Sequence, residues 1–267
     1  MSFSISGKTA IVTGAANGIG LAVARTFADR GANVMCADMD EKRLINELGN
    51  TADEGNIRYF AGDLRQRLTI ANLISATIDA FDEIDILVNA SRQVMETDAL
   101  NPEDTSVEQL LEQNLMTALR LSQQVARRMI KQAENNDNDM PAGSIINLSS
   151  IAAHQTRPEL LGYSIASAGL EQMTRSMALA LAPQRIRVNA VAFGSVMSAS
   201  LKSSIGDHPE WREEIESRTP LHRIASPNEL VDAVQFLASD GSGFVTGDVM
   251  TVDGGRSLLD PVNSPAH

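Results

Sequence analysis

Short apolar segments rich in β-branched residues alternate along this chain with longer segments in which apolar residues recur at helical spacing. The predicted strands cover residues 8–13, 33–38, 57–61, 84–90, 144–149, 186–191 and 249–252. The predicted helices cover residues 18–31, 40–54, 64–81, 102–132, 160–181 and 227–239. This alternation requires parallel strands joined by right-handed crossovers, with helices on both faces of one sheet. We therefore predict an α/β protein with a three-layer, doubly wound parallel sheet in a single domain.

Two segments lack strand or helix periodicity. Residues 133–143 are polar and acidic and end in a proline and a glycine, which predicts an exposed loop. Residues 195–223 are irregular, with a short helix expected near 209–216, and we expect them to cover the substrate side. Neither a repeat nor a linker interrupts residues 1–257, which we predict as the domain. The two prolines of residues 258–267 indicate a C-terminal arm or a disordered tail.

The charge balance limits the partners of this chain. Its 267 residues carry 22 Lys and Arg against 34 Asp and Glu, a formal net charge of −12. Such an acidic chain repels phosphate backbones and anionic lipid, which argues against nucleic acid and membrane partners. No apolar run is long enough to span a bilayer, and residues 1–4 lack the basic start of a secretory signal. We therefore expect a soluble cytoplasmic protein.

Few side chains are available for metal or redox chemistry. The four histidines are scattered and no zinc-ligand spacing occurs, so we expect no metal. The single cysteine, Cys36, lies within an apolar predicted strand, which indicates a buried structural residue. A lone cysteine also excludes an internal disulfide.

A glycine-rich loop joins the first predicted strand to the first predicted helix. It reads Thr13-Gly14-Ala15-Ala16-Asn17-Gly18-Ile19-Gly20. Gly14 permits a tight turn, Gly18 lets the backbone approach a pyrophosphate, and Gly20 lets the helix pack closely on the strand. The helix N-terminus then offers free N–H groups to the phosphates. A glycine loop in this strand–loop–helix context predicts a dinucleotide site of the Rossmann fold.

The residue that ends the second predicted strand bears on the choice of dinucleotide. Asp38 can accept hydrogen bonds from both ribose hydroxyls of the adenosine half, and it would repel a 2′-phosphate. Asp40 adds negative charge, and the glycine loop contains no Arg or Lys. These residues favour NAD over NADP. The alternative is that Asp38 is only a solubilising charge at a strand end.

Further motifs follow in a fixed order along the chain. They are Asp63-Leu64, Asn89-Ala90-Ser91, Asn114, Ser149-Ser150, Tyr163, the segment from Asn189 to Gly194, Thr246-Gly247 and the segment from Val252 to Gly255. With the glycine loop, they make residues 5–257 resemble the short-chain dehydrogenase/reductase family. Two positions depart from the family's motifs, because Ser91 stands where the family has Gly and Phe193 stands where it has Pro.

The resemblance implies hydride transfer between a nicotinamide and an alcohol or carbonyl carbon. Tyr163 would be the general acid/base, Ser150 would hydrogen-bond the substrate oxygen, and Asn114 would help position a water that relays the proton. The implied cofactor contacts are Gly14, Asn17, Gly18, Ile19, Gly20, Asp38, Met39, Asp63, Leu64, Asn89, Ala90, Ser91, Tyr163, Ser167, Gly194 and Val196. The resemblance also implies a homo-oligomer, a dimer or tetramer formed through the helices that contain Asn114 and Tyr163.

The active site departs from the family at position 167. The family has Tyr-x-x-x-Lys, one helical turn apart and on one helix face, whereas this chain has Tyr163 and Ser167. In the family, the ammonium lowers the tyrosine pKa from about 10 and binds the nicotinamide ribose. Ser167 can keep only a short ribose contact. Without a replacement cation, the chemistry near neutral pH should slow by roughly 10²–10³-fold.

Other cations could take the place of the family's lysine. The chain has four lysines, Lys8, Lys42, Lys131 and Lys202. Three of them map to predicted strands and helices away from the site, and the fourth lies in the irregular segment. Arg92, just after the fourth strand, and Arg157, ahead of the sixth helix, are better placed. We predict that Ser167→Lys raises activity near neutral pH. The absence of a gain would mean either that Arg92 or Arg157 has already taken the role, or that the pocket is not built for hydride transfer.

Three functions are compatible with this sequence. The first is an NAD(H)-dependent oxidoreductase that interconverts a secondary alcohol and a ketone, weakened or rearranged at its proton relay. The second is a catalytically impaired NAD-binding protein that acts as a binding or regulatory subunit. The third is another reaction on the same scaffold, such as elimination or epimerisation. Apolar residues of the irregular segment indicate either a partly apolar substrate or ordinary helix packing; they are Met197, Leu201, Ile205 and Trp211.

Overall fold

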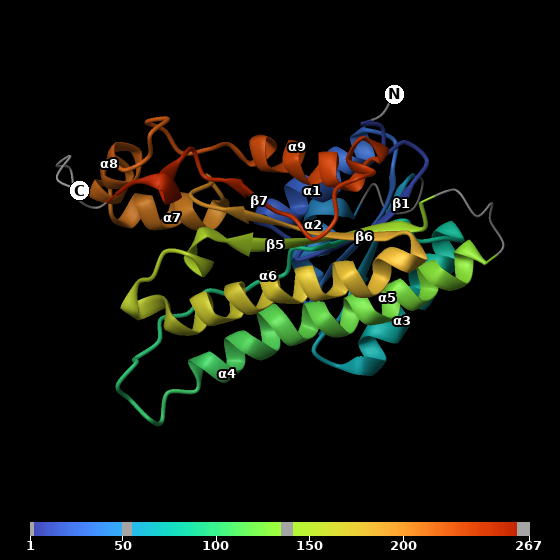
Figure 1. The fold of residues 1–267 in the computed structure, drawn as a ribbon, viewed down its shortest axis with the longest axis horizontal. Helices are drawn as coiled ribbons and strands as arrows, with labels where there is room; N and C mark the ends of the chain where they lie inside the picture. Colours follow the sequence, from blue (N-terminus) through green and yellow to red (C-terminus); the bar gives the residue numbers. More distant parts are fainter. Residues whose placement is uncertain (1–2, 50–54, 135–140, 261–267) are drawn as a thin grey trace.

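Seven parallel strands form the centre of the computed structural model, which describes residues 3–49, 55–134 and 141–260. Their order across the sheet is β3-β2-β1-β4-β5-β6-β7 (Figure 1). The strands are β1 (Thr9–Thr13), β2 (Asn33–Asp38), β3 (Ile57–Ala61), β4 (Ile86–Asn89), β5 (Gly143–Ser150), β6 (Ile186–Phe193) and β7 (Val249–Val252). All seven predicted strands are confirmed, with shifts of one or two residues at some ends.

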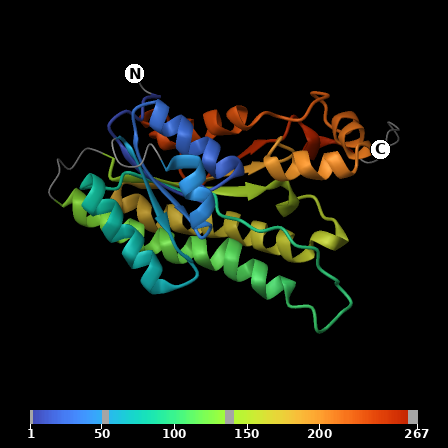
Figure 2. The same ribbon diagram turned by 180° about the vertical axis from the view of Figure 1, so that it is seen from behind.

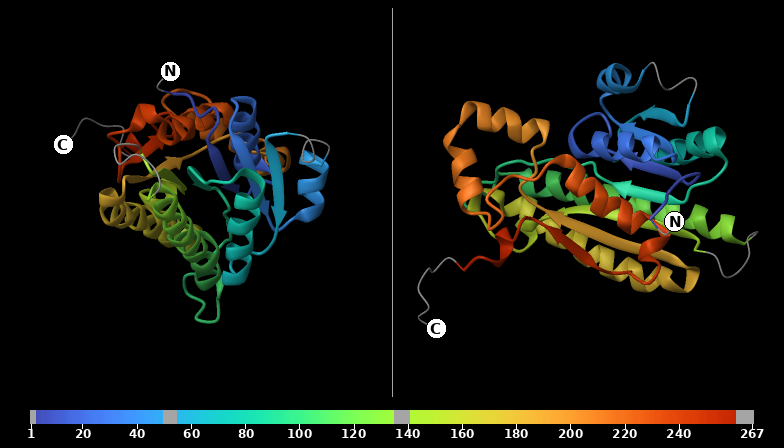
Figure 3. Two further views of the ribbon diagram at one scale, coloured as in Figure 1. Left: turned by 90° about the vertical axis from the view of Figure 1, so that its right-hand side faces the viewer. Right: turned by 90° about the horizontal axis from the view of Figure 1, so that it is seen from above.

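Helices cover both faces of this sheet. One layer contains α1 (Gly18–Asp29), α2 (Glu41–Leu48) and α9 (Pro227–Ala238), and the other contains α3 (Arg67–Phe81), α4 (Ser106–Leu110), α5 (Thr117–Ala133) and α6 (Leu161–Leu181). Figures 1 and 2 show the two layers from opposite sides, and the left view of Figure 3 shows them end-on. The predicted three-layer, doubly wound α/β fold of a single domain is confirmed.

The alternation of side chains along each strand explains why a helix layer packs against each face of the sheet. In β1, Ala10 and Val12 belong to the core under α1 and α9, whereas Ile11 between them belongs to the core under α3 and α5. Successive residues of a strand point to opposite faces, so an apolar strand supplies both cores at once. Cys36 of β2 is fully buried in the first core, as predicted, and burial raises the pKa of its thiol to about 12.

The strand order reverses between β1 and β4. The chain builds β1, β2 and β3 outward to one edge, then returns to place β4 on the other side of β1. In open parallel sheets, ligands bind outside the carboxyl ends of the strands at such a reversal. The glycine loop follows β1, so the topology brings the predicted cofactor loop to this point of the sheet.

The segment at residues 195–223 is more regular than predicted. It contains α7 (Ala199–Asp207) as well as α8 (Glu210–Ser217), the short helix expected near 209–216. The sequence of α7 is rich in serine, and only Leu201 and Ile205 provide a helical i, i+4 pattern, which hid the helix. Figure 1 shows both helices beyond the carboxyl ends of β5 and β6, on the predicted substrate side. The prediction of an irregular segment was therefore wrong over α7.

Three other boundaries differ from the prediction or cannot be compared with it. The helix expected at 40–54 ends at Leu48 within the described part, and residues 50–54 lie outside it. Residues 135–140 of the expected loop and 261–267 of the expected tail also lie outside the described residues. Within residues 3–49, 55–134 and 141–260, no helix is long and apolar enough to cross a membrane.

Candidate functional site

The glycine loop after β1 has no room for side chains at two of its positions. Gly14 has a φ of +66°, and a Cβ there would lie 2.8 Å from the Cα of Ser91. A Cβ on Gly20 would overlap the carbonyl group of Gly14. Only glycine satisfies both constraints, because the turn needs a positive φ and the helix must approach the loop backbone. The structure thus gives Gly14 and Gly20 the roles that the spacing predicted.

The N-terminus of α1 is open on the side of the loop. Gly18 has a φ of +56°, and a Cβ built on it would meet nothing within 4 Å. Asn17, the N-cap residue, makes no capping hydrogen bond with its side chain, and the first turn of α1 contains no acidic residue. Ile19 is buried and anchors the turn. Neither the N-cap side chain nor an acidic side chain of the first turn therefore occupies the first N–H groups of α1, which can receive an anion.

Asp38 lies beside this loop at the carboxyl end of β2. Its Oδ2 accepts a hydrogen bond from the N–H of Ala16 at 3.1 Å, and its Oδ1 accepts one from the N–H of Asp40 at 3.0 Å. The two bonds fix the carboxylate at the edge of the glycine loop. Met39, the next residue, is exposed with 63% of its surface accessible. The predicted adenosine side is thus built from a fixed carboxylate and an open apolar side chain.

Asp63 follows β3 and is already paired. Arg65 donates to its carboxylate through Nε at 2.9 Å and through Nη2 at 2.8 Å. This guanidinium lowers the pKa of Asp63, with the side-chain hydrogen bond as the largest cause. Leu64 between them is buried. The carboxylate of Asp63, which the resemblance assigns to the adenine, is therefore already engaged by Arg65.

The residues after β4 are tied to the glycine loop. The hydroxyl oxygen of Thr13 accepts hydrogen bonds from the N–H groups of Ala90 and Ser91, both at 3.0 Å. Gln113 donates to the hydroxyl of Ser91 at 3.1 Å. The carboxyl ends of β1 and β4 are therefore held together at the strand-order reversal.

Asn89 uses its side-chain amide inside the protein. Its Nδ2 donates to Asn147 Oδ1 at 2.8 Å and to the hydroxyl of Ser122 at 3.0 Å. These bonds join β4 to β5 and to α5. The amide nitrogen is thus committed to the scaffold.

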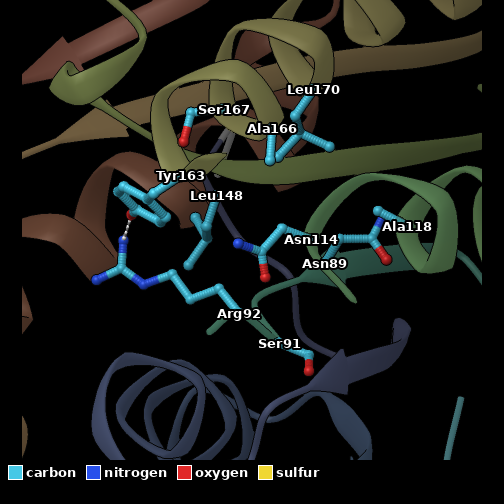
Figure 4. A pocket seen from close by; sticks show the side chains of 10 residues that line it. All are labelled: Asn89, Ser91, Arg92, Asn114, Ala118, Leu148, Tyr163, Ala166, Ser167 and Leu170. Carbon is cyan, nitrogen blue, oxygen red and sulfur yellow. Dashed lines mark hydrogen bonds between the residues drawn. The ribbon is translucent and has the colours of Figure 1, made fainter. Parts of the chain in front are cut away.

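A pocket beside these strand ends collects the predicted nicotinamide-side residues. Figure 4 shows the side chains that line it: Asn89, Ser91, Arg92, Asn114, Ala118, Leu148, Tyr163, Ala166, Ser167 and Leu170. Tyr163 comes from the first turn of α6 and is buried, as is Ser167 one turn further along. Tyr163, Ser167 and Asn114 therefore share one pocket.

Ser150 is the last residue of β5, at the same edge of the sheet. Its hydroxyl oxygen accepts a hydrogen bond from the N–H of Ala152 at 3.2 Å, and the residue is buried. This bond uses one of the two acceptor lone pairs of the oxygen, and the hydroxyl hydrogen can still be donated. Ser150 does not line the pocket of Figure 4, but it is paired in register with Phe193, the last residue of β6.

Asn114 lies in a break of the predicted long helix. Residues Leu111–Met116 are π-helical and separate α4 from α5. The side chain of Asn114 accepts from the N–H of Gln93 and donates to the carbonyl of Gln93, both at 2.8 Å. Such π segments occur frequently at functional sites. Here the amide side chain holds the loop after β4, a contact that the sequence did not predict.

Arg92 donates a hydrogen bond from Nη1 to the phenol oxygen of Tyr163 at 3.0 Å (Figure 4). The other cations considered from the sequence lie elsewhere. Arg157 is exposed and pairs with Glu214 at 4.0 Å, and Lys202 is exposed on α7. Of the two arginines, only Arg92 contacts the predicted catalytic residue.

Glu171 is a buried acidic residue that the sequence reasoning missed. It lies on α6 one turn beyond Ser167 and is 1% exposed. Its Oε1 accepts from the hydroxyl of Ser149 at 3.0 Å, and its Oε2 lies 3.0 Å from His154 Nε2 and 3.6 Å from Arg175 Nη2. One sequence feature could have identified Glu171: it is the lone carboxylate on a helix face that otherwise carries small and apolar residues.

The chain after β6 contains the last two of the predicted cofactor contacts, Gly194 and Val196. A Cβ on Gly194 would lie 2.9 Å from Ile151, and Val196 is buried. Ser195 between them accepts a hydrogen bond from Arg256 Nη1 at 2.9 Å. Burial lowers the pKa of the Arg256 guanidinium.

Among the described residues, no group of three or more His, Cys, Asp or Glu side chains is arranged to hold a metal ion.

Comparison with known proteins agrees with this arrangement. A family model described as enoyl-(acyl carrier protein) reductase matches residues 14–257. A 3-oxoacyl-(acyl-carrier-protein) reductase of Thermotoga maritima is 32% identical over 254 residues, which are 94% of this chain and 98% of that protein. A cis-4-hydroxycyclohexanecarboxylate dehydrogenase of Sinomonas cyclohexanicum is 33% identical over 258 residues, which are 94% of this chain and 97% of that protein.

A solved structure extends the likeness to three dimensions. The complex of 7α-hydroxysteroid dehydrogenase with NADH and 7-oxo glycochenodeoxycholic acid matches with a TM-score of 0.86 and 29% identity. The match covers 95% of this chain and 96% of that one. With the seven-stranded sheet, the glycine loop and the family model over residues 14–257, these relatives identify the chain as an oxidoreductase homologue. The protein belongs to the short-chain dehydrogenase/reductase family.

Proposed function

We propose that this chain is an NAD(H)-dependent oxidoreductase that interconverts a secondary alcohol and a ketone. One observation carries the proposal: the pocket that contains Tyr163 adjoins the glycine loop. Ser91 lines that pocket, and its Cα is also the atom that excludes a side chain at Gly14. A dinucleotide held by the loop therefore has a short path to the phenol of Tyr163.

The loop and its surroundings suit a nicotinamide dinucleotide with an unphosphorylated adenosine ribose. The open space at Gly18 and the uncapped start of α1 can receive the pyrophosphate. Asp38, fixed by two backbone N–H groups, can accept from the ribose hydroxyls and would repel a 2′-phosphate. Asp63 can approach an adenine only by sharing its carboxylate with Arg65.

The protein side of the reaction is a proton transfer at one oxygen atom. A bound nicotinamide supplies the hydride chemistry, accepting a hydride from a carbinol carbon or giving one to a carbonyl carbon. Tyr163 Oη takes the hydroxyl proton during oxidation and returns it during reduction. Ser150 donates its free hydroxyl hydrogen to the substrate oxygen. Asn114 supports the site by holding the backbone of Gln93, and this chemistry requires no metal ion.

Relatives and composition support the substrate and partner classes. The names cis-4-hydroxycyclohexanecarboxylate dehydrogenase and 7α-hydroxysteroid dehydrogenase each describe a hydroxyl on a ring carbon. We therefore propose a small-molecule secondary alcohol or ketone as substrate. The net charge of −12 argues against nucleic acid and membrane partners, and we propose a cytoplasmic homo-oligomer.

The alternative is a catalytically impaired homologue that binds NAD and serves as a binding or regulatory subunit. Ser167 in place of the family's lysine favours it. Turnover separates the two functions, because a subunit that only binds would take up NADH without oxidising or reducing any substrate.

The test compares the parent protein with Tyr163→Phe, which removes only the phenol oxygen. We expect NAD-dependent oxidation of at least one member of a panel of cyclic secondary alcohols. Turnover should fall by about 10²–10⁴-fold in Tyr163→Phe, while the affinity for NADH is kept. NADH binding without turnover on any alcohol or ketone, at about pH 7 or about pH 10, would favour the binding subunit.

A further inference from the structure

The residue that contacts Tyr163 is a departure from the family's usual pattern of proton-transfer residues. Arg92 reaches the phenol oxygen from the loop after β4, on the opposite side of the pocket from α6 (Figure 4). Its Nη1 to Oη distance of 3.0 Å is that of an ordinary hydrogen bond from nitrogen to oxygen. A guanidinium donates and stays charged, so this contact stabilises a phenolate more than a phenol.

A second departure from the family holds the same guanidinium. The Arg92 Cζ atom lies over the ring of Phe193, 4.3 Å from the ring centroid. This separation is typical of a cation–π contact, which a proline at position 193 would not provide. A planar guanidinium can stack on a ring with its face and donate hydrogen bonds from its edge, which an ammonium cannot do as well.

The backbone that carries Arg92 is fixed on both sides. Before it, Ser91 is held by Thr13 and Gln113. After it, Gln93 is held by both polar atoms of Asn114. A side chain mounted between two such anchors loses less entropy on making its contact, so the geometry is preorganised.

The charges around Tyr163 leave Arg92 as the group that acts on it. Of the residues that line the pocket, Arg92 is the one charged side chain. Three charged side chains on neighbouring elements are engaged by other partners. Glu171 on α6 is engaged by Ser149, His154 and Arg175, Glu112 of the π segment pairs with Arg120, and Arg157 pairs with Glu214.

We propose that Arg92 is the cation of this proton-transfer site, replacing the family's lysine, with Phe193 as the residue that positions it. The proposal rests on the proposed oxidoreductase function for its role in turnover. During alcohol oxidation the hydroxyl proton passes to Tyr163 Oη and then to solvent, while the hydride leaves the carbinol carbon for the nicotinamide. Arg92 neither gains nor loses a proton, because a guanidinium is not deprotonated in this pH range.

The direct test measures Tyr163 ionisation and needs no substrate. The chain has two tyrosines, so Tyr59→Phe leaves Tyr163 as the sole one, whose ionisation is followed by tyrosinate absorbance. In that background, Arg92→Met keeps a long side chain but removes the charge and the donor. We expect the ionisation midpoint to rise by about 1 pH unit, because the variant loses a nearby opposite charge. This value is at the lower end of the shifts that such a charge causes, since Arg92 is exposed and solvent screens its charge.

Two further variants make the result specific. Arg157→Met removes an exposed cation that pairs with Glu214, and it should leave the midpoint unchanged. Phe193→Leu removes the ring under Arg92 and should raise the midpoint by less than Arg92→Met does. Circular dichroism of each variant checks that the fold is kept.

An unchanged midpoint in folded Arg92→Met overturns the proposal, whether or not the protein turns over any substrate. A tighter affinity for NADH in Arg92→Met with an unchanged midpoint also overturns it, and would indicate that Arg92 obstructs the cofactor. A raised midpoint in a protein without turnover supports the role of Arg92 at Tyr163 and refutes only the oxidoreductase function.

Discussion

At the end of β2, the carboxylate of Asp38 is held against the glycine loop by the N–H groups of Ala16 and Asp40. A carboxylate fixed in this way is preorganised to accept from a ribose and cannot easily turn away from a 2′-phosphate. Its contribution to cofactor choice should therefore be measurable at the level of one residue.

Asp38→Ala should weaken NADH binding about 10- to 100-fold, because charge-assisted hydrogen bonds contribute about 1.5–3 kcal/mol. NADPH binding should strengthen or stay unchanged, since the variant removes the repulsion. Fluorescence titration of each dinucleotide measures both. Asp29→Asn, an exposed residue at the far end of α1, changes the net charge by the same amount and should leave both affinities unaltered. Equal affinities of the parent protein for NADH and NADPH would refute the ribose role of Asp38.

Individual contacts were the hardest part to predict from the sequence. The motifs singled out Tyr163, Asn114 and Ser167, and the structure places the three in one pocket. The contact of Arg92 with Tyr163 depends on a side-chain direction that no local pattern encodes. The pairing of Asp63 with Arg65 was easier to predict from the sequence, because the two residues are nearly adjacent in the chain.

At the scale of elements, periodicity located the strands and most helices but missed two local changes. The helix expected over 102–132 begins at Ser106 and contains the π segment Leu111–Met116, one extra residue per turn that a search for 3.6-residue periodicity does not register. The helix α7 was missed because its sequence has few apolar residues. Both differences lie close to the candidate site.

The outer faces of α5 and α6 lead to a prediction about assembly. The two helices lie side by side in their layer, with α5 between α3 and α6 (Figure 3), and Leu179 of α6 is 81% exposed. Large apolar side chains on an uncovered helix face favour association. Light scattering should therefore give the mass of two or more chains, each of 28.7 kDa.

Leu179→Asp should shift that mass toward the single chain. Leu68→Asp is the matched control, because Leu68 is 72% exposed on α3 rather than on α6. A parent protein that runs at the mass of one chain would contradict the predicted homo-oligomer.

At the scale of the molecule, the positions that the sequence identified as departures from the family's motifs gather around one pocket of a scaffold that the family shares. The alternation of apolar strands with helices determined the sheet, its layers and the position of the glycine loop, and all of these could be predicted. Ser91, Phe193 and Ser167 lie far apart in sequence, yet Ser91 and Ser167 line one pocket together with Arg92, and Phe193 stacks against Arg92. Their proximity required the three-dimensional structure, because it depends on loops after β4 and β6 meeting α6.

Ser167→Lys, made alone and together with Arg92→Met, is the most direct test of whether Arg92 is the cation that acts on Tyr163. If Arg92 supplies the cation, Arg92→Met lowers alcohol oxidation most near pH 7, and by less toward pH 10, where tyrosine ionises unaided. The expected loss near pH 7 is about tenfold, the rate equivalent of a one-unit shift. Ser167→Lys should then restore most of that loss in Arg92→Met and add little to the parent protein. A large gain in the rate of alcohol oxidation from Ser167→Lys in the parent protein, with no loss of rate in Arg92→Met, would contradict the role of Arg92 as the cation.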